Sequence, residues 1–264
     1  SILNPLIDQF HAPGRPRVLS LVVTIFGDAA LPRGGRIAMA DLSAIMGAVG
    51  VSDGALRTAM SRLAAEGWVE REKAGRLSFY NLSATARRDS EAAADTIYAA
   101  DVLDRRDWIL SVDQHAIDDG GAALTRSVRI LPADRQAAEA EAGRFVISGP
   151  VRHMPDWVAG AIAPADYHPQ FKALQRALTE SGDPGQEGLA PVEALTARVL
   201  IAHHWRRLIL RHPFLPEGFV PADWPGFACL EAVTKAYRAL AEPAEAFWDE
   251  RSDEQTMQAI RDRF

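Results

Sequence analysis

Residues 41–66 show the pattern of two helices joined by a tight turn, and this pattern restricts the possible folds more than any other feature of the chain. The first helix is expected over residues 41–50, with a glycine at its end. Ser52 can cap the second helix, 53–66, by accepting a hydrogen bond from a free backbone N–H. Gly67 follows, and a residue without a Cβ readily adopts the left-handed conformation that ends a helix. The segment is therefore interpreted as a helix-turn-helix.

The second of these helices has one apolar face and one small, polar and basic face. The apolar positions recur at helical spacing, at Leu56, Ala59, Met60 and Leu63. The opposite face offers hydroxyl and guanidinium groups that suit the major groove of double-stranded DNA. The candidate DNA-binding residues in this region are Ser52, Arg57, Thr58, Ser61 and Arg62. Arg57 is the leading candidate for a sequence-dependent contact, whereas Arg62 has the alternative of binding a carboxylate of its own domain.

A hairpin is expected directly after the helix pair. Residues 67–71 and 76–82 have the pattern of its two strands, and residues 72–75 form its tip. Such a tip suits a wing that touches DNA phosphates or the minor groove. Lys73 and Arg76 are the candidate phosphate contacts, because neutralised phosphates dominate the salt-dependent part of DNA affinity.

The charge of the chain is unevenly distributed. Residues 15–88 contain 11 Lys and Arg against 6 Asp and Glu, whereas the other residues contain 18 against 29. A basic region within an acidic chain indicates that one part meets a polyanion and the rest does not. The alternative is a winged helix that serves as a scaffold and binds only protein.

The composition indicates a cytoplasmic protein with more than one core. The chain has 264 residues, 48% of them hydrophobic, which is enough for two or three modest cores. The longest apolar run, residues 18–26, is far too short to cross a membrane, and no signal peptide is expected at the start. The single cysteine, Cys229, excludes a disulfide within the chain and suits a reducing compartment.

The pattern of apolar residues predicts an α+β protein of several domains. Strands are expected at residues 108–112 and 144–148, and helices at 121–131 and 133–142, which together suggest a small α/β sandwich. The predicted organisation is a flexible arm at 1–16, a winged-helix DNA-binding domain at 17–84, a connecting helix at 85–104, a middle domain at 105–165 and a helical C-terminal domain at 166–264.

Two separated segments resemble one family. Residues 50–68, GVSDGALRTAMSRLAAEGW, resemble the R-x-A-x-S-R-L-x-x-x-G-W helix of PaaX-type repressors. Residues 205–216, WRRLILRHPFLP, followed by PADWPG at 221–226, resemble the C-terminal signature of that family. A helix-turn-helix alone is shared by many families, but two signatures in this order, about 150 residues apart, are specific. With GRLSFY at 75–80 in the wing, the resemblance spans nearly the whole chain.

The resemblance implies a function as well as a fold. PaaX-type proteins are cytoplasmic homodimeric repressors of phenylacetic acid degradation genes, and phenylacetyl-CoA is their inducer. The chain is accordingly expected to bind double-stranded operator DNA and to release it when an acyl-CoA binds. The implied architecture is a winged helix, a ferredoxin-like middle domain and a helical C-terminal domain. Neither a catalytic activity nor a cofactor is expected.

A cluster of aromatic and basic residues near the second signature is the candidate acyl-CoA site. Arg207 and Arg211 share one helix face, and paired guanidinium groups bind phosphate well. Trp205 or Trp224 would stack on an aromatic acyl group or on adenine. The alternative is a lock between helix and loop, in which the arginines bind carboxylates and the tryptophans pack on proline.

Two further patterns raise the question of a metal. His203, His204, His212 and Asp223 match no standard zinc spacing, and the two adjacent histidines face different sides of a helix, so no metal site is expected. Asp113 ends the strand at 108–112, where some ferredoxin-like nucleases associated with CRISPR systems hold a metal-binding aspartate. A metal-dependent nuclease is therefore the alternative function, although a single carboxylate without partners supports it weakly.

Overall fold

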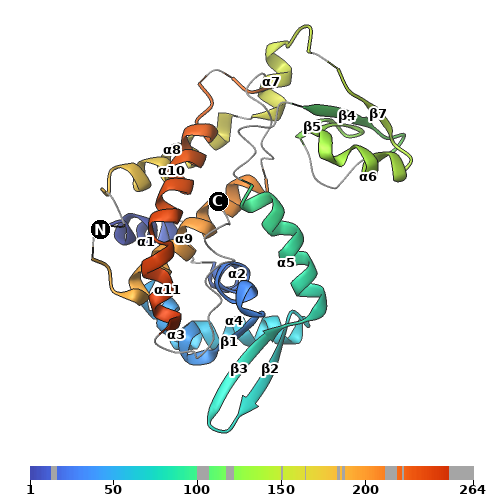
Figure 1. Cartoon of the computed structure of the whole chain (residues 1–264). Coiled ribbons are helices and arrows are strands. Elements are labelled where there is room, and N and C mark those ends of the chain that lie inside the picture. Colours follow the sequence, from blue (N-terminus) through green and yellow to red (C-terminus); the bar gives the residue numbers. More distant parts are fainter. Residues whose placement is uncertain are drawn as a thin grey trace. The chain divides into compact units, whose positions relative to one another are not determined.

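The structure, a computed structural model, is a mixed α+β protein with two small antiparallel sheets and many helices (Figure 1). It divides into two compact units. Unit 1 comprises Ser1–Ala99, Leu174–Arg207 and Glu231–Phe264, and unit 2 comprises Ala100–Ala173 and Leu208–Leu230. The structure describes residues 1–12, 17–99, 107–116, 122–149, 151–163, 165–182, 185, 188–211, 219–221 and 223–249.

Unit 1 contains the helix-turn-helix and wing that the sequence predicts. Their elements are α2 (Val18–Ile25), β1 (Arg36–Ala38), α3 (Met39–Ala48), α4 (Asp53–Ala65), β2 (Val69–Ala74) and β3 (Leu77–Leu82). The three strands form an antiparallel sheet in the order β1-β3-β2. The Oγ of Ser52 accepts a hydrogen bond of 3.3 Å from the N–H of Ala55, as a cap of α4 should. Gly67 has a φ of 69°, so it ends α4 in the left-handed conformation.

The wing is longer than the sequence predicts. β2 extends to Ala74, and its register with β3 pairs Val69 with Leu82 and Ala74 with Leu77. The turn is therefore confined to Gly75 and Arg76, and Gly75 has the positive φ of 61° that so tight a turn requires. The predicted tip at 72–75 is mostly strand, because these polar residues pair with β3 although they bury no side chain.

The N-terminal segment is a helix rather than the predicted flexible arm. α1 (Leu3–His11) buries Leu3, Leu6 and Phe10, which lie on one face of the helix. The ring of His11 also makes a 2.8 Å hydrogen bond to the carbonyl of Val49. The prediction was wrong because this short amphipathic segment becomes stable only when its apolar face packs on the rest of unit 1.

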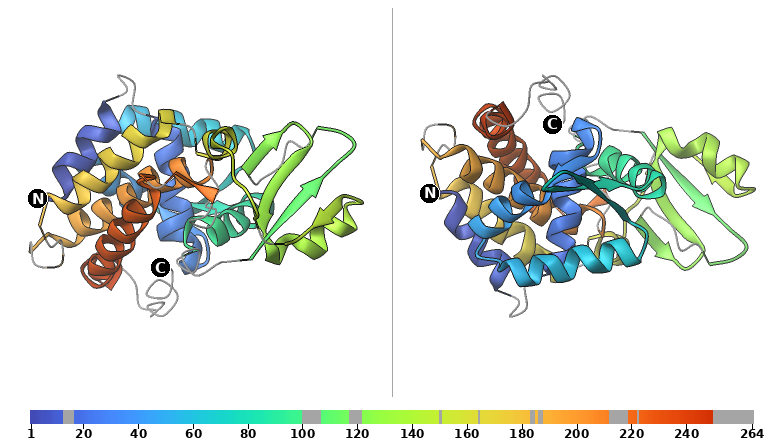
Figure 2. Two further views of the ribbon diagram at one scale, coloured as in Figure 1. Left: turned by 90° about the horizontal axis from the view of Figure 1, so that it is seen from above. Right: turned by 90° about the horizontal axis from the view of Figure 1, so that it is seen from below.

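Unit 1 also contains most of the helices that come after the wing in the sequence. They are α5 (Ala84–Ile97), α9 (Pro191–Ile209), α11 (Ala241–Asp249) and the C-terminal parts of α8 (His168–Thr179) and α10 (Gly226–Ala239). α9 is buried on all sides from Ala194 to Trp205, and the other helices surround it in both views of Figure 2. It is thus the central helix of this unit.

Four successive side chains of α9 make hydrogen bonds to three other helices of unit 1. The bonds are His203 Nδ1 to Thr24 Oγ1 at 3.0 Å, His204 Nε2 to the carbonyl of Leu6 at 3.0 Å, Trp205 Nε1 to the carbonyl of Ile97 at 2.8 Å, and Arg206 Nη2 to the carbonyl of Ser20 at 3.1 Å. Consecutive helical positions point in different directions, so one turn of α9 reaches α1, α2 and α5 together. The winged helix and the C-terminal helices consequently share one core.

Unit 2 is built on a second antiparallel sheet. Its strands are β4 (Trp108–Val112), β5 (Ala122–Thr125), β6 (Val128–Pro132) and β7 (Phe145–Ile147), and its helices include α6 (Gln136–Glu141) and α7 (Asp156–Ile162). The strands lie in the order β5-β6-β4-β7, and all neighbours are antiparallel. The segment between β4 and β5 includes residues 117–121, which lie outside the described residues.

The helix predicted at 121–131 is wrong, because this stretch forms the hairpin of β5 and β6. Val128 and Ile130 are β-branched, and β6 lies between β5 and β4, where both of its edges are paired.

Alternate side chains of β4 point to opposite faces of the sheet. The hydroxyl of Ser111 donates a 2.6 Å hydrogen bond to Glu139 of α6, whereas Leu110 packs against a core that includes Val158 of α7.

No helix among the described residues is at once long and apolar enough to span a bilayer.

Candidate nucleic-acid interface

α4 separates its two faces as the sequence predicts. Its inner face packs into the domain through Leu56, Ala59, Met60 and Leu63, none of which is more than 6% exposed. Its outer face and its cap are open to solvent. The exposed candidates there are Ser52, Arg57, Thr58, Ser61 and Arg62. The structure therefore brings all five predicted residues of this region onto one accessible surface.

The polar side chains of this surface differ in whether they have hydrogen-bond partners within the protein. Arg57 makes no hydrogen bond or ion pair with any described residue, so its guanidinium is available to an external partner. Arg62 instead donates a 2.7 Å hydrogen bond from Nε to Glu66, one turn away, and this bond raises the pKa of Arg62. Thr58 donates its hydroxyl to the carbonyl of Gly54 at 2.9 Å, which leaves the oxygen lone pairs outward as acceptors.

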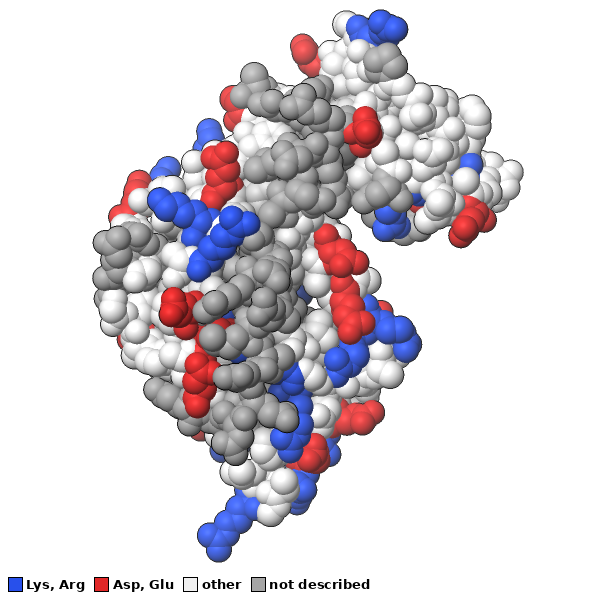
Figure 3. All heavy atoms as spheres, viewed as in Figure 1, with Lys and Arg blue, Asp and Glu red and all other residues white. Residues whose placement is uncertain are grey.

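The wing presents free cations at its end. Lys73 and Arg76 are exposed and make no hydrogen bond or ion pair within the described part of the chain. Figure 3 shows basic side chains protruding at the end of the β2–β3 hairpin. The nearby acid Glu72 is paired with Arg36 through two hydrogen bonds of 3.0 and 3.1 Å, and it also accepts one from Asn81. The bonds from Arg36, then Asn81, lower the pKa of Glu72, and its charge is paired with that of Arg36 on the sheet.

One further basic group of the wing was not singled out from the sequence. Arg71 of β2 is exposed and donates a 3.0 Å hydrogen bond to the hydroxyl of Ser78 on β3. A cross-strand pair of this kind fixes the guanidinium above the hairpin. The signal available in the sequence was the alternation along the strand, which places Arg71 and Lys73 on the same face.

The four predicted acyl-CoA residues have different environments. Trp205 is 1% exposed, and its indole N–H donates a 2.8 Å hydrogen bond to the carbonyl of Ile97. Trp224 packs edge-to-face on Phe171, with ring centroids 5.0 Å apart. Arg207 is half-buried and Arg211 is exposed. Trp205 and Arg207 belong to unit 1, whereas Arg211 and Trp224 belong to unit 2.

The described residues among those considered for a metal do not gather into a metal site. His203 and His204 are buried, and burial lowers the pKa of both, to about 4 for His204. Asp223 is exposed, and His212 lies outside the described residues. Within the described ranges, no three His, Cys, Asp or Glu side chains lie close enough together to hold a metal ion.

Asp113 is part of a structural cluster in unit 2. Its Oδ2 accepts a 3.2 Å hydrogen bond from Arg144, and its Oδ1 accepts one of 2.9 Å from the N–H of His115. These bonds, the backbone one first, lower the pKa of Asp113. Arg144 also pairs with the buried Glu139 at 3.0 Å. The carboxylate is thus neutralised by an arginine, where a metal-binding aspartate would need further carboxylates.

Comparison with known proteins agrees with this arrangement. Residues 17–86 match the family described as PaaX-like protein, and residues 161–250 match the PaaX-like protein C-terminal domain. The chain is 28% identical to the "Transcriptional repressor PaaX" of Escherichia coli (strain K12), over 89% of this chain and 84% of that protein. Among solved structures it resembles "Uncharacterized protein Rv0674 from Mycobacterium tuberculosis" with a TM-score of 0.47 and 19% identity, covering 87% of this chain and 97% of the other. A structural likeness of that extent bears on neither fold nor function.

Proposed function

Because the chain belongs to the PaaX-like family of transcriptional repressors, we propose that it represses transcription by binding double-stranded operator DNA through α4 and the β2–β3 wing. The observation that carries this proposal is the division of α4. One face is fixed in the domain core, while the other exposes hydroxyls beside the guanidinium of Arg57, which pairs with no described residue. A rigid helix of this kind can enter a major groove without first exchanging internal bonds.

The DNA-contacting residues have two roles in this proposal. Arg57, Thr58 and Ser61 read base edges, since an arginine can donate two hydrogen bonds to guanine and a hydroxyl can pair with either purine or pyrimidine groups. Ser52, Arg62, Lys73 and Arg76 contact phosphates and fix the register on the duplex. Arg71 is added to this second group because it is exposed on the same strand as Lys73.

The proposed active species is a homodimer in the cytoplasm. Two copies related by a two-fold axis would place their α4 helices in successive major grooves, about 34 Å apart along the duplex. The operator would then be an inverted repeat whose half-sites are separated by about one helical turn.

An acyl-CoA, such as phenylacetyl-CoA, is the proposed inducer, and genes for aromatic (phenylacetate) catabolism are the proposed targets. For the inducer to release the operator, it must bind the conformation that cannot hold DNA more tightly than the conformation that can. The four residues that the sequence suggests for the acyl-CoA fall in both units, Trp205 and Arg207 in unit 1 and Arg211 and Trp224 in unit 2, so they are not proposed as one site.

The alternative of a metal-dependent nuclease receives no support from the sheet of unit 2. Arg144 holds Asp113, and the described residues contain no group of three metal-ligating side chains. The family consists of repressors rather than enzymes.

The proposal is tested by selecting bound sequences from a library of randomised duplexes. Enrichment of one inverted repeat, followed by loss of binding when phenylacetyl-CoA is added, is the expected result. Enrichment of no sequence, or binding that the acyl-CoA leaves unchanged, would contradict the DNA-binding and the inducer parts of the proposal respectively.

A further inference from the structure

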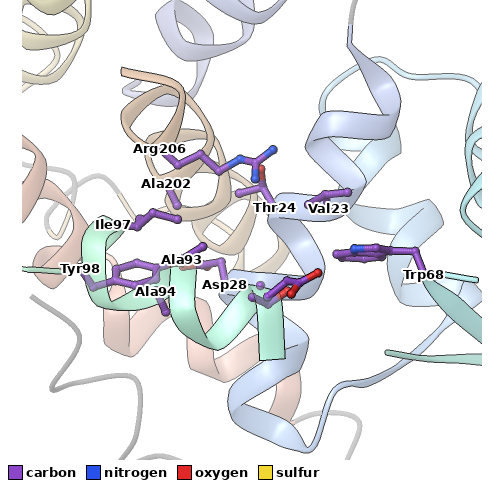
Figure 4. Close-up of a pocket in the computed structure, with 13 residues that line it drawn as sticks. Val23, Thr24, Asp28, Trp68, Ala93, Ala94, Ile97, Tyr98, Ala202 and Arg206 are labelled. Carbon is purple, nitrogen blue, oxygen red and sulfur yellow. Dashed lines mark hydrogen bonds between the residues drawn. The ribbon is translucent and has the colours of Figure 1, made fainter. Parts of the chain in front are cut away.

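A cavity of about 160 Å³ lies inside unit 1, beside the winged helix. Its walls come from α2, α5 and α9 and from Trp68, which follows the end of α4 (Figure 4). Exposed Asp89 of α5 is among the lining residues, so the cavity reaches the surface there. Elements about 180 residues apart in the sequence thus share one hollow next to the DNA-binding domain.

The size and lining of the cavity suit a single aromatic ring. A cavity of about 150 Å³ is known to hold one benzene molecule, and this one is similar in volume. Small and apolar side chains form much of its wall, at Val23, Ala93, Ala94, Ile97 and Ala202. The rings of Trp68 and Tyr98 face the same space from opposite sides in Figure 4. There is no room for a whole coenzyme, but there is room for a ring with a short side arm.

Arg206 supplies a positive group at one wall. Its Nη2 donates to the carbonyl and to the hydroxyl of Ser20, at 3.1 and 2.9 Å, and this fixes the guanidinium in place. Its Nε is buried and has no hydrogen-bond partner among the described residues. The acid that lines the same cavity, Asp28, already accepts hydrogen bonds from Tyr98 and from two other side chains. The guanidinium of Arg206 thus places a positive charge at the cavity wall, which an oxygen of a ligand can neutralise.

Arg206 is largely buried, yet it has no acidic partner among the described residues. Burial lowers the pKa of Arg206, because a charge is disfavoured away from water. The described residues place no carboxylate in an ion pair with it. A carboxylate or a polarised carbonyl oxygen in the cavity would supply that partner.

The position of Trp68 links the cavity to the DNA-binding surface. The backbone N–H of Trp68 donates a 2.9 Å hydrogen bond to the carbonyl of Leu63 in the last turn of α4. Its carbonyl accepts from the N–H of Ser83, the cap of α5, at 3.1 Å. Its ring also packs edge-to-face on Phe26, with centroids 5.7 Å apart. A shift of the backbone at Trp68 therefore bears on the ends of both α4 and α5.

We propose that this cavity is the effector site, and that it takes one aromatic ring carrying a short arm that ends in a carboxyl or thioester carbonyl oxygen, which lies against the guanidinium of Arg206. The inference rests on the proposed repressor function, whose inducer it locates. The ring lies among Val23, Ala93 and Trp68. If the ligand is an acyl-CoA, the coenzyme part remains outside the mouth near Asp89. Binding favours the conformation in which Trp68 has moved, and so couples the cavity to α4.

The test is isothermal titration calorimetry of the full chain with phenylacetate, phenylacetyl-CoA and CoA alone. Ala93→Phe fills the cavity, and Ala92→Phe is its matched control, because Ala92 is exposed on the same helix and does not line the cavity. Arg206→Gln removes the cation. We expect Ala93→Phe and Arg206→Gln each to weaken binding at least tenfold, while Ala92→Phe binds like the unmodified protein and CoA alone does not bind. Binding of phenylacetate would identify the free acid as sufficient, and binding of the thioester alone would show that the coenzyme contributes at the mouth.

Equal ligand affinity in Ala93→Phe and Ala92→Phe would overturn the proposal, as would failure of both aryl compounds to bind. If Ala93→Phe melts early, Arg206→Gln provides the test, and unchanged affinity in that variant would overturn the proposal. DNA binding is measured separately without ligand. A chain that binds the ligands in this cavity but selects no DNA sequence would refute the repressor function and leave the ligand site standing.

Discussion

The guanidinium Nε of Arg198 lies 3.2 Å from Oδ2 of Asp28, and both side chains are completely buried. Asp28 belongs to the π-helical turn that continues α2, and Arg198 belongs to α9. Arg198 also donates a 2.9 Å hydrogen bond to Glu245 of α11, which in turn pairs with Arg33. Two acids and two arginines thus balance inside unit 1, and they join the winged helix to the C-terminal helices.

Removing one charged side chain from this buried cluster should lower the free energy of unfolding. Asp28→Asn leaves an uncompensated buried cation, which typically costs about 3–5 kcal/mol of unfolding free energy. Urea denaturation of the variant and of the unmodified chain measures the change. Glu72→Gln is the control, because Glu72 pairs with Arg36 at the surface and water screens that pair. Similar losses in the two variants would show that the buried cluster does not hold unit 1 together.

Stability should fall as the solution is acidified from neutral pH. Burial first of all, and then the nearby charge of Arg207, lower the pKa of His203 and of His204, to about 4 for His204. The folded protein keeps these rings neutral, whereas the unfolded chain takes up protons below about pH 6.5, so acid favours unfolding. For His204 alone the loss between pH 7.5 and pH 5 is about 2 kcal/mol.

Urea denaturation at those two pH values measures this dependence. The lowered pKa values of Asp113 and Glu72 affect stability only at lower pH, so they do not obscure the window. His204→Gln keeps a side-chain donor for the carbonyl of Leu6 but does not titrate, and its stability should change less with pH. An equal pH dependence in the variant would mean that His204 is not the source.

Arg57 should matter more for sequence-specific binding than Arg62. Arg57→Ala should weaken binding to the selected operator by about 1–3 kcal/mol, and weaken binding to unrelated duplexes much less. Arg62→Ala is the comparison on the same helix, because Arg62 is already engaged by Glu66 and should lose less specificity. Gel-shift titrations with both duplexes give the ratio. Unchanged specific affinity in Arg57→Ala would remove this residue from the interface.

The wing should contribute salt-dependent affinity. Lys73→Ala and Arg76→Ala should each reduce the slope of log affinity against log salt concentration by about one unit, with a similar effect on every duplex. Measuring affinity at several salt concentrations provides the slope. A loss confined to the specific operator would instead indicate that the wing reads bases.

The winged helix could be predicted because its signals are local. The cap at Ser52, the stop at Gly67 and the apolar spacing of α4 each depend on residues a few positions apart, and the structure confirms them. The hairpin of β5 and β6 could not, because Leu124, Ile130 and Leu131 also suit a helix. What decides their conformation is pairing with β4, which is a tertiary effect.

The cavity could not be predicted for the same reason. Trp68 and Arg206 belong to the segments that carry the family resemblance, but only the fold places them on one hollow with Asp28. The sequence does contain one hint. Asp28 follows an apolar helix, and an acid in that position has to find partners inside the protein. The sequence does not indicate which residues those partners are.

The central claim is that α4 lies in the major groove, and methylation interference on the selected operator tests it most directly. Methylation of guanine at N7 blocks a major-groove acceptor. We predict interference at guanines in both half-sites, about one helical turn apart, and loss of interference at one position per half-site in Arg57→Ala. Full binding to duplexes methylated at every guanine N7 of the operator would contradict the account.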